Sequence, residues 1–199
     1  MWVVKIGGSM TRHALLADWL DLLARLGGGR VTLVCGGGRF ADEVRRAQAR
    51  WHFDDLQAHN MAVLAMAQNA YLAQGLNKAL RLAASADEIR QVLHGGHTAL
   101  WLPYDRMCSE ADATTNWDLT SDSIALELAR RLNAERLVVV KSCPIARTAT
   151  LGELGATGVL DPSFAGLAAG AAFPIDVIRH SELTRMRALL LGEIHSFTH

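Results

Sequence analysis

The sequence has little lysine, little cysteine and no net charge, and each shortage excludes a class of protein. Lysine plus arginine equals aspartate plus glutamate at 20 each, so no basic field suggests binding to nucleic acid or to a membrane. No apolar run approaches the ~20 residues that span a bilayer, and the first residues do not resemble a signal peptide. The three cysteines form no Cys-x-x-Cys pair, which argues against a zinc site and for a reducing compartment. We therefore expect a cytoplasmic protein.

Short apolar segments alternate with longer amphipathic segments along the 199 residues. Apolar strands separated by helices are typical of an α/β fold whose mainly parallel sheet is covered on both faces. A polar, irregular stretch at 103–117 separates an N-terminal from a C-terminal half. The pattern predicts strands at 2–6, 31–35, 98–102, 137–140 and 175–178, and helices at 12–26, 39–50, 55–82, 86–93, 120–133 and 182–191.

Chemically distinctive residues follow the predicted strands, at the sheet edge where such folds bind ligands. Only three lysines occur in the chain, and Lys5 and Lys141 stand at strand ends. Glycines let backbone amides approach phosphate oxygens, and cations balance the charge of a phosphoryl group in transfer. A carboxylate such as Asp122 can orient a lysine or a Mg²⁺ ion. The relevant stretches are Lys5-Ile-Gly7-Gly8-Ser9, Gly36-Gly37-Gly38-Arg39, Asp118-Leu-Thr-Ser-Asp122 and Lys141-Ser142.

Gly-Gly-Gly-Arg occurs twice, and the two runs have different contexts. Residues 27–30 follow a predicted helix, where glycine commonly ends the helix. Residues 36–39 follow a strand and begin a helix, where exposed amides and the helix dipole favour an anion. Residues 36–41 also fit the dinucleotide fingerprint, but no strand with an acidic end follows about 20 residues later. The P-loop sequence does not occur.

Several of these residues also have an ordinary structural explanation. Asp118 and Asp122 could cap the helix that they begin. His94 and His97 flank a Gly-Gly pair, which favours a polar turn over a metal site, and we expect no metal-ligating set in the chain. Trp117 could stack on a ligand ring, but packing in the core is the more common role of tryptophan.

Three stretches of the chain together resemble the amino acid kinase superfamily. The order of the motifs matches from residue 1 to about residue 142, and the similarity points most to the branch of aminomethylfuran phosphate kinases. The resemblance implies an open α/β/α sandwich of about eight strands. It also implies an acceptor-binding half at 1–117 and a nucleotide-binding half, shortened, at 118–199. The matching stretches are Lys5-Ile-Gly-Gly-Ser9, Cys35-Gly-Gly-Gly-Arg-Phe-Ala-Asp42 and Trp117-Asp-Leu-Thr-Ser-Asp-Ser-Ile-Ala125.

The resemblance implies a role for each matching residue. Lys5 would contact the transferring phosphoryl group, and Asp122 would organise the catalytic lysines. Many relatives supply a second catalytic lysine from a Gly-Gly-Met-x-x-Lys stretch, but residues 158–164 contain none, so Lys141 would replace it. The nucleotide would be bound by Gly7, Gly8, Ser9, Lys141 and Ser142. The acceptor would be bound by Gly36, Gly37, Gly38, Arg39 and Asp118.

The function implied by the resemblance is transfer of a phosphoryl group from ATP, with Mg²⁺, to a phosphate monoester. The acceptor would be an aminomethylfuran phosphate of methanofuran-type cofactor biosynthesis, and the product a diphosphate. A nucleoside monophosphate or an amino acid carboxylate stays open as the acceptor. A non-catalytic ligand-binding or storage protein of the same fold also stays open. Most members of the superfamily form homodimers or larger homo-oligomers, and we expect the same here.

Overall fold

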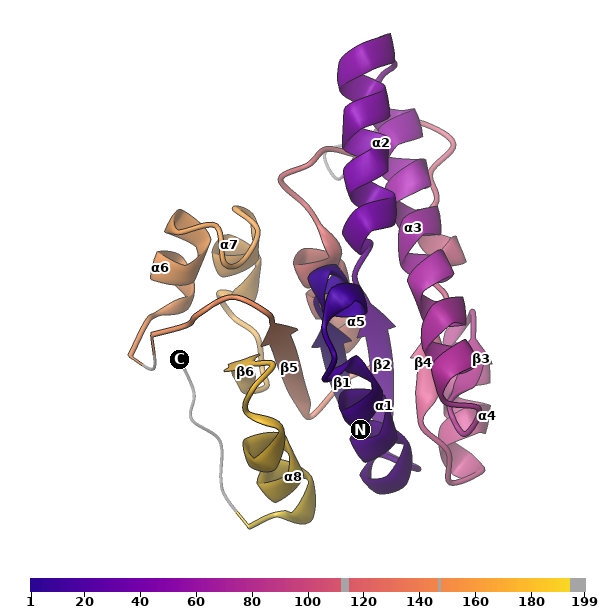
Figure 1. The fold of residues 1–199 in the computed structure, drawn as a ribbon, viewed down its shortest axis with the longest axis vertical. Coiled ribbons are helices and arrows are strands. Elements are labelled where there is room, and N and C mark those ends of the chain that lie inside the picture. Colours follow the sequence, from indigo (N-terminus) through magenta and orange to yellow (C-terminus); the bar gives the residue numbers. More distant parts are fainter. Residues whose placement is uncertain (112–114, 147, 194–199) are drawn as a thin grey trace.

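The computed structural model describes residues 1–111, 115–146 and 148–193, and these residues build a sheet between two layers of helices (Figure 1). Within the described residues the sheet has six strands in the order β3-β4-β2-β1-β5-β6. Every adjacent pair of strands is parallel. The strands are β1 (Trp2–Ile6), β2 (Val31–Cys35), β3 (Arg81–Ala83), β4 (Ala99–Trp101), β5 (Arg136–Lys141) and β6 (Ile175–Arg179).

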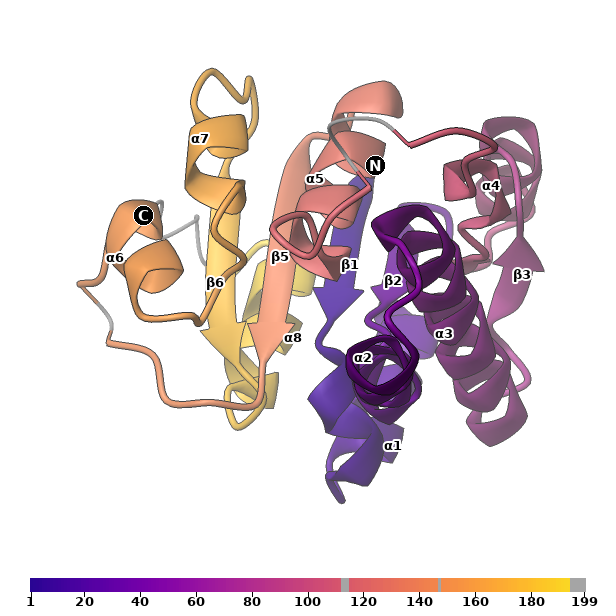
Figure 2. The ribbon, with the colours of Figure 1, turned by 90° about the horizontal axis from the view of Figure 1, so that it is seen from above.

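Helices cover both faces of the sheet, as the alternating pattern predicts (Figures 1 and 2). One apolar cluster joins α4, α5, α6 and α7 to one face, and a second joins α1, α3 and α8 to the other. The α-helices are α1 (Leu16–Leu26), α2 (Gly38–Trp51), α3 (Asp55–Leu76), α4 (Ala86–His94), α5 (Ser121–Arg131), α6 (Leu151–Ala156), α7 (Phe164–Ala168) and α8 (Leu183–Leu191). Two short 3₁₀ helices are η1 (Gly8–Arg12) and η2 (Tyr104–Arg106).

The structure corrects two expectations about the strands. The expected number of about eight is wrong, because six strands form the sheet in the described part of the chain. The helix predicted at 55–82 ends at Leu76, and residues 81–83 form the edge strand β3. This strand was missed because it has only three residues and its first, Arg81, is exposed, so it carries no apolar run.

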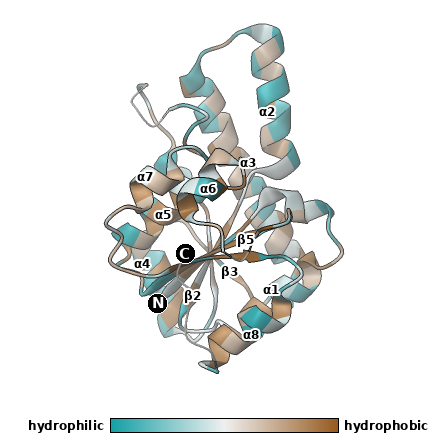
Figure 3. Ribbon diagram, turned by 90° about the vertical axis from the view of Figure 1, so that its left-hand side faces the viewer, coloured by the Kyte–Doolittle hydropathy of each residue, from teal (hydrophilic) through white to brown (hydrophobic). Residues whose placement is uncertain are grey.

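Helices α2 and α3 form a hairpin that rises beyond the carboxyl ends of the strands (Figures 1 and 3). Asp54 caps the start of α3 by accepting a hydrogen bond from the backbone nitrogen of Gln57 at 3.2 Å. The loops after β1, β2 and β5 converge below this hairpin, because parallel strands end at one edge of their sheet. The candidate residues of three distant stretches therefore meet at this edge.

The loops after β1 and β2 touch backbone to backbone. A Cβ atom on Gly8 would lie 2.0 Å from the backbone nitrogen of Gly38, and one on Gly36 would lie 2.6 Å from the nitrogen of Gly8. Gly38 has a φ of 53°, which glycine adopts without strain. This close approach is a packing reason for the glycines that is independent of any ligand.

We expect Gly8→Ala to lower the free energy of unfolding by ~2 kcal/mol or more, because the methyl group would overlap backbone that has nowhere to move. Gly75→Ala is the control, since a Cβ atom there meets no heavy atom within 4 Å. Alanine in a helix is favoured over glycine by about 0.5–1 kcal/mol, so this control should be neutral or stabilising. Urea unfolding of both variants measures the difference. Equal stabilities would contradict the close contact.

Candidate active site

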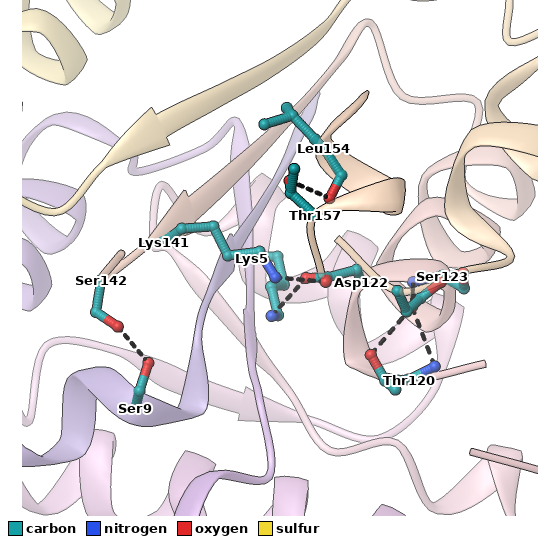
Figure 4. Close-up of polar contacts among 10 residues, drawn as sticks. Lys5, Ser9, Thr120, Asp122, Ser123, Lys141, Ser142, Leu154 and Thr157 are labelled. Atoms are coloured by element: carbon teal, nitrogen blue, oxygen red, sulfur yellow. Dashed lines mark hydrogen bonds and ion pairs between the residues drawn. The ribbon is translucent and has the colours of Figure 1, made fainter. Parts of the chain in front are cut away.

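Two lysines share one buried carboxylate at the carboxyl edge of the sheet (Figure 4). Lys5 Nζ donates to Asp122 Oδ1 at 2.6 Å, and Lys141 Nζ donates to Asp122 Oδ2 at 2.5 Å. In the register of the parallel strands β1 and β5, Lys5 lies opposite Val139, so Lys141, two residues further, faces the same side of the sheet. Helix α5 packs on that side and brings Asp122 between the two ammonium groups. The cluster thus joins residues separated by more than 100 positions.

Burial and charge act in opposition on this cluster. Burial raises the pKa of Asp122, but the positive charges of Lys5 and Lys141 outweigh it and hold the pKa below the ordinary value of 3.8. Burial lowers the pKa of Lys5 from 10.5, although the charge of Asp122 opposes this change. Asp122 is therefore ionised at neutral pH. Lys5 and Lys141 both line the cleft described next, where an ammonium group favours an anion.

A cleft of about 400 Å³ lies directly over the cluster. Its walls come from the loops after β1, β2 and β5, from α2 and α3, and from the start of α5. At one wall, the hydroxyl groups of Ser9 and Ser142 form a hydrogen bond with 2.6 Å between their oxygens (Figure 4). The cleft is lined by these residues expected from the sequence: Lys5, Gly7, Gly8, Ser9, Gly37, Gly38, Arg39, Asp122, Lys141 and Ser142.

Two expected acceptor-binding residues lie outside this lining. The carbonyl oxygen of Gly36 accepts a hydrogen bond from the side chain of the buried Asn69 at 2.6 Å, so Gly36 supports the glycine loop from behind. Asp118 is exposed, and its backbone nitrogen donates to Asn116 Oδ1 at 2.8 Å. The structure therefore places Gly36 behind the glycine loop and Asp118 at the surface outside the cleft lining.

The cleft lining contains residues that the sequence analysis missed or judged differently. Trp117 lines the cleft and is half-buried, so it is not an ordinary core residue. The Arg45 guanidinium lies 4.1 Å from the centre of its ring, and the indole nitrogen donates to Gln48 Oε1 at 2.7 Å. Arg12, in η1, is an exposed cation that also lines the cleft. No motif marks Arg12 or Arg45, whose positions depend on long-range packing.

The remaining candidates lie elsewhere or form no site. His94 ends α4 at the amino end of β4, and the backbone nitrogens of Gly96 and His97 donate to the carbonyl oxygens of Leu93 and Val92, as in a turn that ends a helix. No group of three His, Cys, Asp or Glu side chains with metal-binding geometry occurs in the part of the chain that the structure describes. The three cysteines are free thiols. No helix among the described residues is long and apolar enough to cross a membrane.

Known proteins resemble this chain in sequence and in fold. The model of the amino acid kinase family matches residues 1–144. The chain is 27% identical to the (5-(aminomethyl)furan-3-yl)methyl phosphate kinase of Methanocaldococcus jannaschii over 142 residues. That match covers 70% of this chain and 64% of the relative, so it spans less than two thirds of the relative's length.

Solved structures share the fold over nearly the whole chain. The UMP kinase of Bacillus anthracis has a TM-score of 0.71 at 16% identity and matches 96% of this chain and 91% of its own. The uridylate kinase of Archaeoglobus fulgidus has a TM-score of 0.70 at 15% identity, over 96% and 95% of the two chains. An isopentenyl phosphate kinase has a TM-score of 0.61 at 14% identity, over 96% of each chain. At such identities the likeness establishes the fold.

We expect Asp122→Asn to lower the free energy of unfolding at neutral pH by about 3 kcal/mol, because it leaves two buried or partly buried ammonium groups without their carboxylate. The folded pKa of Asp122 lies below 3.8, so its stabilising effect is present above that pH and is lost as the pH falls through the folded pKa. The difference in the free energy of unfolding between Asp122→Asn and the wild type should therefore become smaller in acid.

Urea unfolding between neutral pH and about pH 3 measures this difference at each pH. Asp87→Asn is the matched control, because Asp87 pairs with Arg90 on the surface and is 82% exposed. Its difference from the wild type should be small throughout. A difference for Asp122→Asn that stays constant down to the lowest pH would contradict the assignment of the stabilising charge to Asp122.

Proposed function

The chain belongs to the amino acid kinase family, and from this membership we propose that it transfers a phosphoryl group from ATP to a phosphate monoester. The observation that carries the proposal is the pair of lysines held by one buried carboxylate beneath a cleft with two glycine loops. Phosphoryl transfer depends mainly on positioning and on neutralising charge, and this arrangement supplies both. The non-catalytic alternative is less favoured, because the family that matches the chain and the similar proteins are kinases.

Each part of the cluster has a task in this proposal. Lys5 and Lys141 hydrogen-bond to phosphoryl oxygens as negative charge shifts between the leaving and attacking groups. Asp122 holds both ammonium groups in place, so little reorganisation is needed during the reaction. Gly7 and Gly8 line the cleft beside Lys5, so the backbone of this loop is open to the nucleotide phosphates.

The residues that line the cleft fit ATP when it is bound as its complex with Mg²⁺. When bound, the magnesium nucleotide supplies the phosphoryl group and part of the positive charge around it. Both oxygens of Asp122 are bound by ammonium groups, so this carboxylate is a lysine organiser and not a metal ligand. The fit is therefore to a magnesium ion that arrives on the nucleotide's phosphates.

We propose that the acceptor binds on the side of α2 and α3, within residues 1–117, and the nucleotide on the side of residues 118–199. Arg39 provides a cation on the acceptor side, where Trp117 lines the cleft with Arg45, which also pairs with Asp42, over its ring. Such a site suits a phosphate joined to a small ring. An aminomethylfuran phosphate meets this description and is named for the relative that is 27% identical.

The exposed side of α3 supports the expected homodimer. Its 22 residues contain one acidic residue, Asp55, and no lysine or arginine. A helix face in water normally carries charged residues, so an apolar one is typical of an interface. A second copy can pair with this uncharged face about a twofold axis without repulsion between like charges. The exposed apolar side chains of α3 are Met61, Leu64, Tyr71, Leu72 and Leu76.

We expect Lys141→Met to lower turnover by ~10²-fold, the usual effect of losing one fixed electrostatic contact to the reacting group. Lys78→Met is the control, because Lys78 is exposed and follows α3 outside the cleft. Mass spectrometry of diphosphates formed from Mg-ATP and a panel of phosphate monoesters measures the rates. Absence of any diphosphate with the wild type would overturn the proposed function, and full activity of Lys141→Met would remove Lys141 from the mechanism.

We expect Arg39→Ala to raise the Michaelis constant for the acceptor far more than that for ATP. Arginine binds phosphate through two parallel hydrogen bonds, which are lost on truncation. Arg46→Ala is the control, because Arg46 lies on the same helix but pairs with Glu43 and is 71% exposed. Steady-state kinetics with each substrate varied separately gives both constants. Equal increases for the two substrates would place Arg39 at the transferred group and not at the acceptor.

A further inference from the structure

The start of α5, which carries Asp122, is not capped by its own residues. Thr120 is the capping residue by position, but its side chain makes no capping hydrogen bond within the helix. The first amides of a helix have no partner inside it and need one from elsewhere. A shift or fraying of this helix start would move Asp122 away from both lysines. What holds it therefore matters for the site.

The partner comes from a segment about 40 residues further along the chain. Asp161 Oδ2 accepts hydrogen bonds from the backbone nitrogens of Thr120 at 3.1 Å and Ser123 at 3.0 Å, and from Thr120 Oγ1 at 3.0 Å. Asp161 Oδ1 accepts one from Ser123 Oγ at 2.6 Å. Thr120 and Ser123 lie on either side of Asp122 in the sequence and close to it in space (Figure 4). Two of the four hydrogen bonds hold backbone amides and two hold hydroxyl groups, so Asp161 fixes the chain before and after Asp122.

Asp161 is itself rigidly placed. Its side chain is 5% exposed, and the following α7 begins with Phe164, which is fully buried in the core. The backbone nitrogen of Phe164 donates to the carbonyl oxygen of Asp161 at 3.1 Å. Just before Asp161, Gly158 and Val159 line the nucleotide side of the cleft. Asp161 thus ties this wall of the cleft to the helix that carries Asp122.

We propose that Asp161 is a positioning residue: its carboxylate fixes the start of α5 so that Asp122 stays between Lys5 and Lys141. As a statement about catalysis this inference rests on the proposed kinase function, but its geometric content does not. The negative charge of Asp161 also acts on Lys5, whose pKa is lowered by burial and raised by Asp122 and, more weakly, by Asp161. Loss of Asp161 would therefore disturb the lysine cluster both by position and by charge.

Asp161→Asn is the main test, with Ser123→Ala as a second variant that removes only one of the four hydrogen bonds. Because the chain contains three lysines, labelling lysine with ¹³C and ¹⁵N gives three sets of side-chain NMR signals. We expect Asp161→Asn to shift the signals of Lys5 and Lys141, to lower the pKa of Lys5 and to leave Lys78 unchanged. Ser123→Ala should produce a smaller shift in the same two lysines. Its result decides the question if Asp161→Asn does not fold.

Ser85→Ala is the matched control, because Ser85 caps α4 by accepting from the backbone nitrogen of Glu88, on a helix whose residues do not line the cleft. It should leave all three lysine signals in place. In the kinase assay, we expect Asp161→Asn to lower kcat by about 10²-fold with the acceptor Michaelis constant within about twofold, as for a misplaced catalytic group.

Unchanged signals of Lys5 and Lys141 in folded Asp161→Asn would overturn the inference. So would equal shifts in the Ser85→Ala control. The NMR result does not depend on catalysis, so a wild type without kinase activity would refute the proposed function and leave the positioning role to be judged by the lysine signals alone.

Discussion

The structure depends on one buried carboxylate that holds two ammonium groups. Asp122 joins β1, β5 and α5 at the carboxyl edge of the sheet, so the two halves of the chain meet at a charge cluster. A buried ion pair adds little net stability, but removing one of its partners is costly. The pair therefore favours the packing of β1, β5 and α5 that keeps all three side chains in contact. Lys5 and Lys141 both line the cleft above this carboxylate. The position of two ammonium groups at the base of the cleft is therefore a consequence of how the fold closes.

The glycine loops also help to bring the elements together at the carboxyl edge of the sheet. The loops after β1 and β2 approach so closely that there is no room for a side chain at Gly8 or at Gly38. This contact fixes the floor of the cleft beside Lys5 and leaves its backbone open to a ligand. Packing requires glycine here, and the proposed binding of phosphate calls for the same residue type. For that reason the motif alone cannot separate the two roles, and the contact distances are needed.

Sequence reasoning recovered what local pattern and the rule for parallel sheets determine. Lys5, Lys141 and Asp122 were predicted as one site because two followed apolar strands and one began a helix, and strand ends meet at one edge. The three-residue β3 carries no such pattern, and the expected eight strands came from resemblance alone. Arg45 and Asp161 could not be predicted, because long-range packing brings Arg45 to Trp117 and Asp161 to the start of α5.

The place of Asp161 bears on how this chain manages without a lysine in residues 158–164. Lys141 reaches Asp122 directly from the end of β5, so the later segment need not supply a cation. That segment instead supplies a carboxylate that accepts from the amides at the start of α5, where the helix dipole also favours negative charge. A cation at the strand end and an anion at the helix start both act on Asp122. The two features are thus complementary: Lys141 at the end of β5 supplies the cation, and Asp161 in the 158–164 segment supplies the carboxylate that orients Asp122.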